Sequence, residues 1–378
     1  MDKNQKLIIV ITMFASCLGV SSMASSYNFT KSASYSTSGT VDVKDRTYEI
    51  TDIILSAGYS DASCTVNGLQ GQTLSNDEIE NFFVEDKDVT DSYDNHFVKL
   101  KRYYVSMSQA SNGVMTYKLS TTKKDSSYFV CPYFYDKDGN EIEYAYYGKY
   151  KGSISGEKLC SKSGSSLTAT YNTTLDSFRN YAKANGDQYH QTDWCTVFTA
   201  QIIFMCMYKT TQASNFMEYR SSGSNTILGN GDKYLGIEDI VGNGYECVDG
   251  MVVRSGTTLD ACSISWANKI SDYKSNLTTN QSYLIGATKT TAYISKKYYS
   301  EGKPILSLFP KEMNGSTDGT TYYCDCFTFN SSYSPNSTFW GAFSKAYSSN
   351  GLFCLASHSN WDLSSAVITS RLHAKKLN

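Results

Sequence analysis

The stretch that decides the fold is Gly236–Gly250, which reads GIEDIVGNGYECVDG. Its Gly242-Asn243 pair predicts a turn, because both residue types tolerate the backbone conformations that turns require. The residues after the turn predict a strand that carries Tyr245 and Cys247 on one face and Glu246 on the other. The stretch therefore indicates a turn that leads into a strand, and its neighbours show which fold holds that strand.

Two helices are predicted before this stretch. Thr173 or Thr174 can cap a helix with the sequence LDSFRNYAKAN, and Gly186 suits its C-terminal end. A second helix begins near Asp193 and continues through WCTVFTAQIIFMCMYK. Because this helix is apolar on most sides, we expect it in the core. Two helices followed by long Gly/Ser/Asn loops and short strands are unusual for a sandwich, a barrel or a doubly wound fold.

The N-terminal part has a β pattern. Thr40–Tyr48 alternates in polarity, and His96–Met107 with Val114–Leu119 resembles a hairpin around an Asn-Gly turn. The acidic Asn76–Asp88 is either a short helix or a loop. These features predict a small β-sandwich-like domain over residues 27–125, for which we expect an attachment or oligomerisation role.

Residues 1–26 allow two interpretations. Leu7–Val20 is apolar, follows a short Lys-containing stretch and precedes small residues, which is the outline of a secretory leader. Phe14–Cys17 also resembles a lipoprotein box. The alternative is a pair of buried strands, because Ile, Val and Thr dominate the first half of the apolar stretch.

The composition narrows the class of partners. Lys and Arg total 34 and Asp and Glu total 36, and no basic run stands out. The sequence therefore shows no basic stretch of the kind that binds nucleic acid or anionic lipid. The 31 tyrosines, with abundant Ser, Gly and Thr, are typical of adaptable recognition surfaces.

The cysteines indicate neither a metal nor a redox site. The chain has 11 of them, no pair has C-x-x-C spacing, and none of the 4 histidines belongs to a metal-ligand pattern. We interpret most of the cysteines as small buried apolar residues, which favours assembly in a reducing cytoplasm.

Four segments share a pattern with one known family. They are Tyr147–Tyr150 with Gly152 and Ser153; Phe178–Trp194; Gly236–Gly250; and a closing set of Tyr322–Asp325, Trp340-Gly341, Gly351–Phe353 and Ser370–Leu372. Together they resemble the C-type-lectin-fold domains of phage tail and receptor-binding proteins and of retroelement-diversified variable proteins. The resemblance covers about two-thirds of the chain. One departure is that Gly244, Tyr245 and Cys247 stand where the family commonly has a Trp.

The resemblance implies an α+β fold, with a C-type-lectin-like binding domain over residues 126–378 behind the β-sandwich-like domain. Formylglycine-generating oxidases share this fold, but their chemistry needs a paired thiol or copper site. Cys354 has no Cys three or five residues away. We therefore expect no enzymatic activity, no catalytic residue and no cofactor.

Three smaller constellations of residues have simpler interpretations than a catalytic or metal site. His190, Asp193 and Cys195 could form a Cys/His nucleophile pair, but Asp193 is better explained as a helix N-cap. The sequence at 136–140, DKDGN, starts like a calcium loop but lacks the closing Glu, which favours an Asp-Gly turn. The sequence at 360–362, NWD, has the residue types of a lectin calcium motif in the wrong order. We expect no metal site.

The predicted ligand-binding face lies within Ser344–Thr369. Apolar anchors, among them Leu352, Phe353 and Leu355, alternate there with small or polar positions. In the resembling family this region is exposed and binds the ligand. The predicted contact residues are Lys345, Tyr347, Ser349, Asn350, Ser357, His358, Asn360, Trp361 and Asp362.

These features lead to one functional expectation and several alternatives. We expect a phage virion protein, in a tail or appendage, that binds a bacterial surface receptor, either a protein or a glycan. Such proteins contact other virion proteins and usually form homo-oligomers, often trimers, because repetition gives avidity. The alternatives are a bacterial surface lipoprotein displayed through Cys17, a purely structural virion protein, and an enzyme on the same fold.

Overall fold

The computed structural model describes the backbone of residues 35–37, 41–44, 47–50, 53–57, 64–67, 72–109, 115–208, 227–231, 233–255, 261–266, 284–286, 291–297, 308, 310–313, 326–329, 336–341, 351–360 and 362–378. Side chains are described for residues 75–109, 116–208, 227–231, 233–251 and 362–378, and for short pieces between 308 and 359. The expected leader or strand segment over residues 1–26 lies outside the described residues.

The helices of the described chain are α2 (Asn76–Phe83), α3 (Leu175–Lys183), α4 (Trp194–Tyr208) and the short 3-10 helix η1 (Pro132–Phe134). Helix α2 resolves the ambiguity of the acidic stretch at its start. Ser75 and Glu78 form a capping box there, in which each side chain accepts a hydrogen bond from the other residue's backbone N–H.

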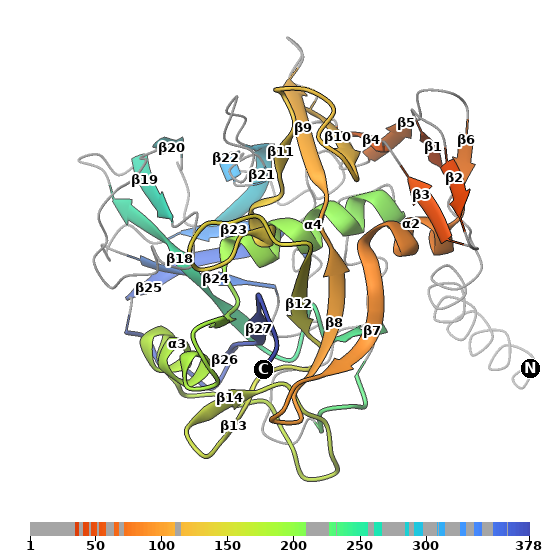
Figure 1. Cartoon of the computed structure of the whole chain (residues 1–378). Helices are drawn as coiled ribbons and strands as arrows, with labels where there is room; N and C mark the ends of the chain where they lie inside the picture. The colour runs from red at the N-terminus through yellow and green to blue at the C-terminus, as the bar shows by residue number, and fades with distance from the viewer. Residues whose placement is uncertain are drawn as a thin grey trace, which may run out of the picture.

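Both predicted helices are confirmed, with the expected caps. Thr174 accepts a hydrogen bond from the backbone N–H of Ser177 at the start of α3. Asp193 accepts one from the backbone N–H of Thr196 at 2.7 Å, which caps α4. All residues of α4 except the last, Tyr208, are buried, as its apolar sequence requires. Figure 1 shows α4 crossing the middle of the molecule.

A five-stranded sheet lies next to this helix. Its strands are β7 (Val84–Thr90), β8 (His96–Lys101), β12 (Tyr144–Gly148), β15 (Tyr189–Gln191) and β27 (Leu372–Ala374). The order is β15-β27-β12-β8-β7, and every pair is antiparallel. Tyr147 on β12 therefore pairs with Val98 on one side and with His373, near the end of the chain, on the other.

A nine-stranded sheet contains the stretch that opened the sequence argument. Its strands are β18 (Tyr245–Ser255), β19 (Ala261–Trp266), β20 (Leu284–Gly286), β21 (Thr291–Lys297), β22 (Pro310–Met313), β23 (Cys326–Phe329), β24 (Asn336–Trp340), β25 (Leu355–Asn360) and β26 (Ile368–Thr369). The order is β19-β20-β22-β21-β23-β25-β24-β18-β26. The predicted turn is present before β18, where Gly242 and Asn243 both have positive φ angles, of 90° and 52°.

The remaining strands are N-terminal or short. A seven-stranded sheet contains β1 (Tyr35–Thr37), β4 (Ile53–Ala57), β5 (Cys64–Asn67), β6 (Gln72–Leu74), β9 (Tyr104–Gln109), β10 (Met115–Ser120) and β11 (Phe129–Val130). Three two-stranded sheets pair β2 (Val41–Lys44) with β3 (Thr47–Ile50), β13 (Ser153–Ser155) with β14 (Lys158–Cys160), and β16 (Lys233–Tyr234) with β17 (Ile237–Glu238).

The predicted hairpin is only half correct. Strands β9 and β10 do pair as antiparallel neighbours. The first predicted arm, however, is two strands in two sheets, because the chain leaves strand geometry at Arg102-Tyr103. There the backbone N–H of Arg102 donates to the carbonyl of Glu143, so that β8 stays beside β12 while β9 joins the N-terminal sheet.

For the same reason, strand pairing crosses the expected domain boundary between residues 125 and 126. Strand β8 lies before this boundary, yet it pairs along its length with β12, which lies after it. One apolar cluster also joins Ile79 of α2 and Tyr117 of β10 to Phe198 of α4. With few helices and many short, mainly antiparallel strands, the described part is compatible with the expected α+β class.

Candidate functional site

The predicted ligand-binding face is described only in part. His358 and Asn360 lie on β25, and Asp362 follows that strand with an exposed side chain. Lys345, Tyr347, Ser349, Asn350 and Trp361 lie outside the described residues, as do the side chains of His358 and Asn360.

Ser357 does not lie on an exposed face. Its side chain is fully buried on β25, and its backbone pairs in parallel with Phe329 of β23. The sequence pattern missed this because Ser is small and polar enough to occupy either face of a strand. The apolar anchors Leu352, Phe353 and Leu355 are buried, as predicted.

A network of buried charged and polar side chains lies between β18 and the five-stranded sheet. Its centre is Glu246 on β18, which is fully buried. Lys151 donates from Nζ to Glu246 Oε1 at 2.8 Å, and Arg371 donates from Nε to the same oxygen at 3.0 Å. Thr192 donates from Oγ1 to Oε2 at 2.5 Å. Burial alone would raise the pKa of Glu246, but the two cations and these hydrogen bonds lower it to about 2.

Arg371 ties this centre to the opening strand and to the predicted turn region. It is fully buried, and its Nη1 donates to the carbonyl of Gly148 at 3.2 Å. Its Nη2 donates to the carbonyls of Glu238 and Asp239 at 2.9 and 3.0 Å. A planar guanidinium can serve all these acceptors at once, which an ammonium could not do.

A second buried ion pair lies beside the first. Arg179 of α3 donates from Nε to Asp249 Oδ2 at 2.7 Å and pairs through Nη2 with Oδ1 of the same carboxylate. Gln191 Nε2 also approaches Asp249 Oδ2, at 3.3 Å. The bidentate pair fixes α3 against the end of the Gly236–Gly250 stretch.

Two buried histidines stack next to this network. The ring centroids of His190 on β15 and His373 on β27 lie 5.5 Å apart, with 26° between the ring planes. His190 Nδ1 lies 3.2 Å from Asp193 Oδ2, and His373 Nε2 lies 3.3 Å from Thr192 Oγ1. Burial is the largest cause that lowers the pKa of both imidazoles, and the neighbouring His190 lowers the pKa of His373 further.

The geometry also decides between the two interpretations of His190, Asp193 and Cys195, which were a nucleophile pair and a helix N-cap. Asp193 caps α4, and Cys195 in its first turn is almost fully buried. Burial raises the pKa of the Cys195 thiol well above its usual value, which disfavours the nucleophilic thiolate. The interpretation of Asp193 as an N-cap is therefore confirmed.

Of the two calcium-like motifs, only the segment at 136–140 can be followed in full, because Trp361 and the side chain of Asn360 lie outside the described residues. Asp136 Oδ1 accepts backbone hydrogen bonds from Asp138 and Asn140, and Oδ2 accepts one from the Asn140 side chain, so the DKDGN segment is a closed turn. Among the described residues, no group of three or more His, Cys, Asp or Glu side chains is placed to hold a metal ion.

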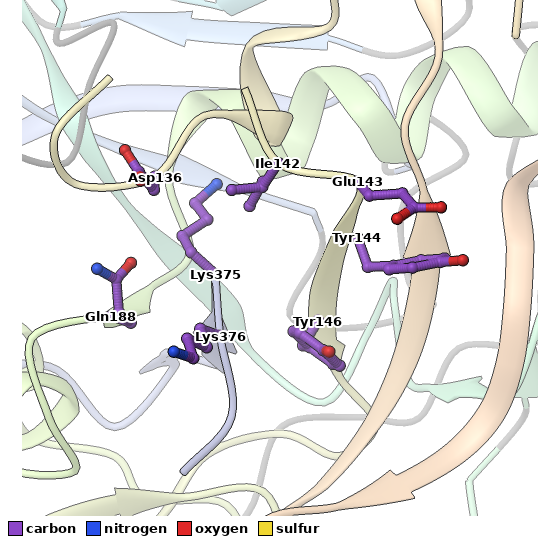
Figure 2. A pocket seen from close by; sticks show the side chains of 8 residues that line it. All are labelled: Asp136, Ile142, Glu143, Tyr144, Tyr146, Gln188, Lys375 and Lys376. Carbon is purple, nitrogen blue, oxygen red and sulfur yellow. The ribbon is translucent and has the colours of Figure 1, made fainter. Parts of the chain in front are cut away.

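One surface pocket was not anticipated from the sequence. It has a volume of about 220 Å³ and lies where β12 meets the end of the chain. Figure 2 shows Tyr144 and Tyr146 on one side of it, Gln188 on the opposite side and Lys375 between them. The alternation of tyrosines in EIEYAYYGKY predicted a strand, and the tyrosines on its outer face were the only available signal of a pocket.

Comparison with known proteins adds no family to this description. No family model matches the chain, and no curated protein matches it significantly. Within the described residues, no helix is long and apolar enough to cross a membrane.

Proposed function

We propose that this chain is a non-enzymatic binding protein of a phage virion, in a tail or appendage, whose C-terminal part is a C-type-lectin-like domain. Its ligand is a bacterial surface receptor, a protein or a glycan, contacted through the region around Lys345–Asp362. The other partners in this proposal are virion proteins and further copies of the same chain.

The convergence of the four lectin-like sequence segments on one buried network carries this proposal. The opening segment supplies the carbonyl of Gly148 and flanks Lys151, which lies between Tyr150 and Gly152. The helical segment supplies Arg179 and Thr192. The Gly236–Gly250 segment supplies Glu246 and Asp249. The closing segment supplies Arg371. Segments separated by up to 223 residues that exchange buried hydrogen bonds behave as parts of one domain.

The pairing of the opening and closing strands supports the same proposal. Tyr147 of β12 lies opposite His373 of β27, so the two ends of the lectin-like region are adjacent strands of one sheet. A domain closed in this way leaves the long connections between its other strands free to carry a binding surface.

The proposed face has a rigid support. Leu352, Phe353 and Leu355, which lie within the proposed region, are buried, and Trp340 donates from Nε1 to the carbonyl of Leu352 at 2.6 Å. Asp362 is exposed beyond the end of β25. Polar side chains on a fixed strand framework bind with little loss of entropy, which is how recognition surfaces gain affinity.

A cell-binding experiment tests this function. Fluorescently labelled protein is measured by flow cytometry on a panel of bacterial strains, beside a variant with His358→Ala, Asn360→Ala and Asp362→Ala. We expect saturable binding to at least one strain, and a loss of about tenfold or more in affinity for the variant. The matched control carries Lys123→Ala and Lys124→Ala in an exposed segment and keeps its binding. Equal binding by all three proteins would overturn the proposed face.

The apolar stretch Leu7–Val20 and the box at Phe14–Cys17 favour a second candidate, a bacterial surface lipoprotein adhesin with the same domain. Intact mass of the protein from its native source separates the two. A mass that includes residues 1–16 supports the virion protein. A mass that begins at Cys17 with added lipid supports the adhesin.

A further inference from the structure

We propose that the pocket between β12 and the end of the chain is a separate ligand site, which takes a single neutral sugar ring. The proposal does not rest on the function proposed above, because none of the residues that line this pocket belongs to the Lys345–Asp362 region.

The first observation is a pair of aromatic rings that are fixed before any ligand arrives. Tyr144 and Tyr146 both line the pocket and are half-buried, whereas their neighbour Tyr147 points into the core. Tyr146 packs edge-on against the ring of Phe97, with centroids 6.4 Å apart. The Nζ of Lys99 lies 3.8 Å from the centroid of the Tyr144 ring. A tyrosine held in this way offers a large apolar face at low entropic cost.

The second observation is an unpaired acceptor on the opposite wall. Gln188 Oε1 is buried and has no hydrogen-bond partner among the described residues. A buried acceptor without a donor destabilises the protein, because the hydrogen bond it made to water is not replaced. A ligand hydroxyl that donates to this oxygen would recover that energy, so the pocket favours a ligand with O–H donors.

The third observation concerns charge. The ammonium of Lys375 is not available to a ligand, because its Nζ donates to the carbonyl of Tyr133 at 2.5 Å and lies over the Tyr133 ring. Its aliphatic stem therefore lines the pocket as apolar surface. The exposed charges at the rim, Lys376 and Glu143, are opposite in sign. The carboxylate of Asp136 is already occupied within its own turn. No net charge remains to select a phosphate or a carboxylate.

The size and chemistry together define the ligand class. At about 220 Å³ the pocket is smaller than the roughly 300–1,000 Å³ that holds drug-sized molecules, which fits one ring rather than a chain. A pyranose has an apolar C–H face for a tyrosine ring and hydroxyls for Gln188. A neutral sugar therefore matches both walls of the pocket, whereas a purely apolar ligand would leave the Gln188 oxygen unpaired.

The test is saturation-transfer difference NMR with the full chain and three probes: methyl glucoside, methyl galactoside and N-acetylglucosamine. We expect transfer to at least one sugar, strongest at the protons of its apolar face. Tyr146→Ala and Gln188→Ala should each weaken binding about tenfold. Tyr146→Phe keeps the ring and should restore it. Tyr93→Ala, which removes an exposed tyrosine that does not line the pocket, should leave binding unchanged.

Two outcomes would overturn the site. One is the absence of transfer to all three sugars. The other is transfer that persists unchanged in both Tyr146→Ala and Gln188→Ala, provided that circular dichroism shows both variants folded. Competition of the bound sugar by inorganic phosphate would contradict the neutral ligand class. None of these outcomes affects the cell-binding test of the Lys345–Asp362 face, so the two proposals fail independently.

Discussion

Glu246 shows how a single buried residue can fix the relative position of distant segments. A carboxylate removed from water is strongly disfavoured unless donors replace the lost hydration. Here Lys151, Arg371 and Thr192 supply those donors, and they come from three separate parts of the chain. The lowered pKa of Glu246 shows that the donors outweigh the cost of burial.

Replacing the Glu246 carboxylate should lower the free energy of unfolding. In Glu246→Gln, Lys151 and Arg371 remain buried without a counter-charge, so we expect the free energy of unfolding to fall by about 3–5 kcal/mol. Urea unfolding followed by circular dichroism measures this change. The control is Glu85→Gln, an exposed residue 3.9 Å from Lys101, whose loss should cost less than about 1 kcal/mol. A loss for Glu246→Gln no larger than that of the control would contradict this view of the network.

Gly148 on β12 lies so close to the neighbouring strand that a larger residue should not fit. A Cβ added to Gly148 would lie 2.0 Å from the carbonyl oxygen of Leu372, which belongs to the neighbouring strand backbone and cannot move aside. We expect Gly148→Ala to destabilise the protein by several kcal/mol, on the scale of strongly overpacked cores. Gly164→Ala, whose Cβ would meet Leu167 at an ordinary 3.6 Å, should change the melting temperature little.

At the scale of elements, strand β27 joins β15 to β12 in the five-stranded sheet. Its His373 pairs across to Tyr147 of β12 and to His190 of β15, so the stacked histidines connect two strand pairs. Both imidazoles have a pKa below the ordinary value of 6.5 because they are buried. The folded protein therefore takes up fewer protons here than the unfolded chain.

This difference predicts acid sensitivity. Above about pH 6.5 both states are neutral at these positions and nothing is lost, but as the pH falls below that value only the unfolded chain gains protons. Stability should therefore fall on acidification, first through the histidines. It should fall further below about pH 4.5, where the unfolded-state Glu246 becomes protonated and the folded one does not. Melting temperatures between pH 8 and pH 5 measure the first step. In a His190→Gln, His373→Gln variant this first decline should flatten, and an unchanged slope would assign the effect to other groups.

The helices and their caps could be predicted from the sequence because their signals are local. Thr174 and Asp193 each precede an apolar periodic stretch, and capping depends only on residues within one turn. The buried charges could not be paired in this way. Nothing in the residues near Glu246 indicates that its partners stand 95 residues before it and 125 residues after it.

At the scale of the whole molecule, the described cysteines share one environment. The six whose side chains are described are all buried, and they are Cys131, Cys160, Cys195, Cys206, Cys247 and Cys354. This matches the interpretation of cysteines as buried apolar residues in a protein assembled under reducing conditions. We expect iodoacetamide to label these six slowly in the native protein and fully in denaturant, as measured by peptide mass spectrometry. A disulfide between any two of them in the protein from its native source would contradict this prediction.

The pairing of strands that are distant in the sequence was the feature of the fold that local patterns could not predict. The polar stretch after β10 has the composition of a linker, which placed the boundary near residue 125. Strand pairing is not local, and the residues of β8 carry no mark that distinguishes a partner before them from one more than forty residues after them. Local patterns therefore could not reveal that β8 pairs across the expected boundary between residues 125 and 126.

The pairing of β8 with β12 makes a prediction about fragments. A fragment of residues 126–378 retains all four lectin-like segments but lacks α2, β7 and β8. In this fragment β12 loses the strand that pairs with one of its edges. Helix α4 also loses its packing against Ile79 and Phe82 of α2. We expect this fragment to be insoluble or to unfold without a cooperative transition. A fragment of residues 75–378 keeps α2, β7 and β8 and should melt cooperatively, since the five-stranded sheet and its buried network are then complete. Thermal unfolding of the two fragments decides the matter. If the shorter fragment melts as cooperatively as the longer one, β7 and β8 are an addition to a domain that is already stable without them.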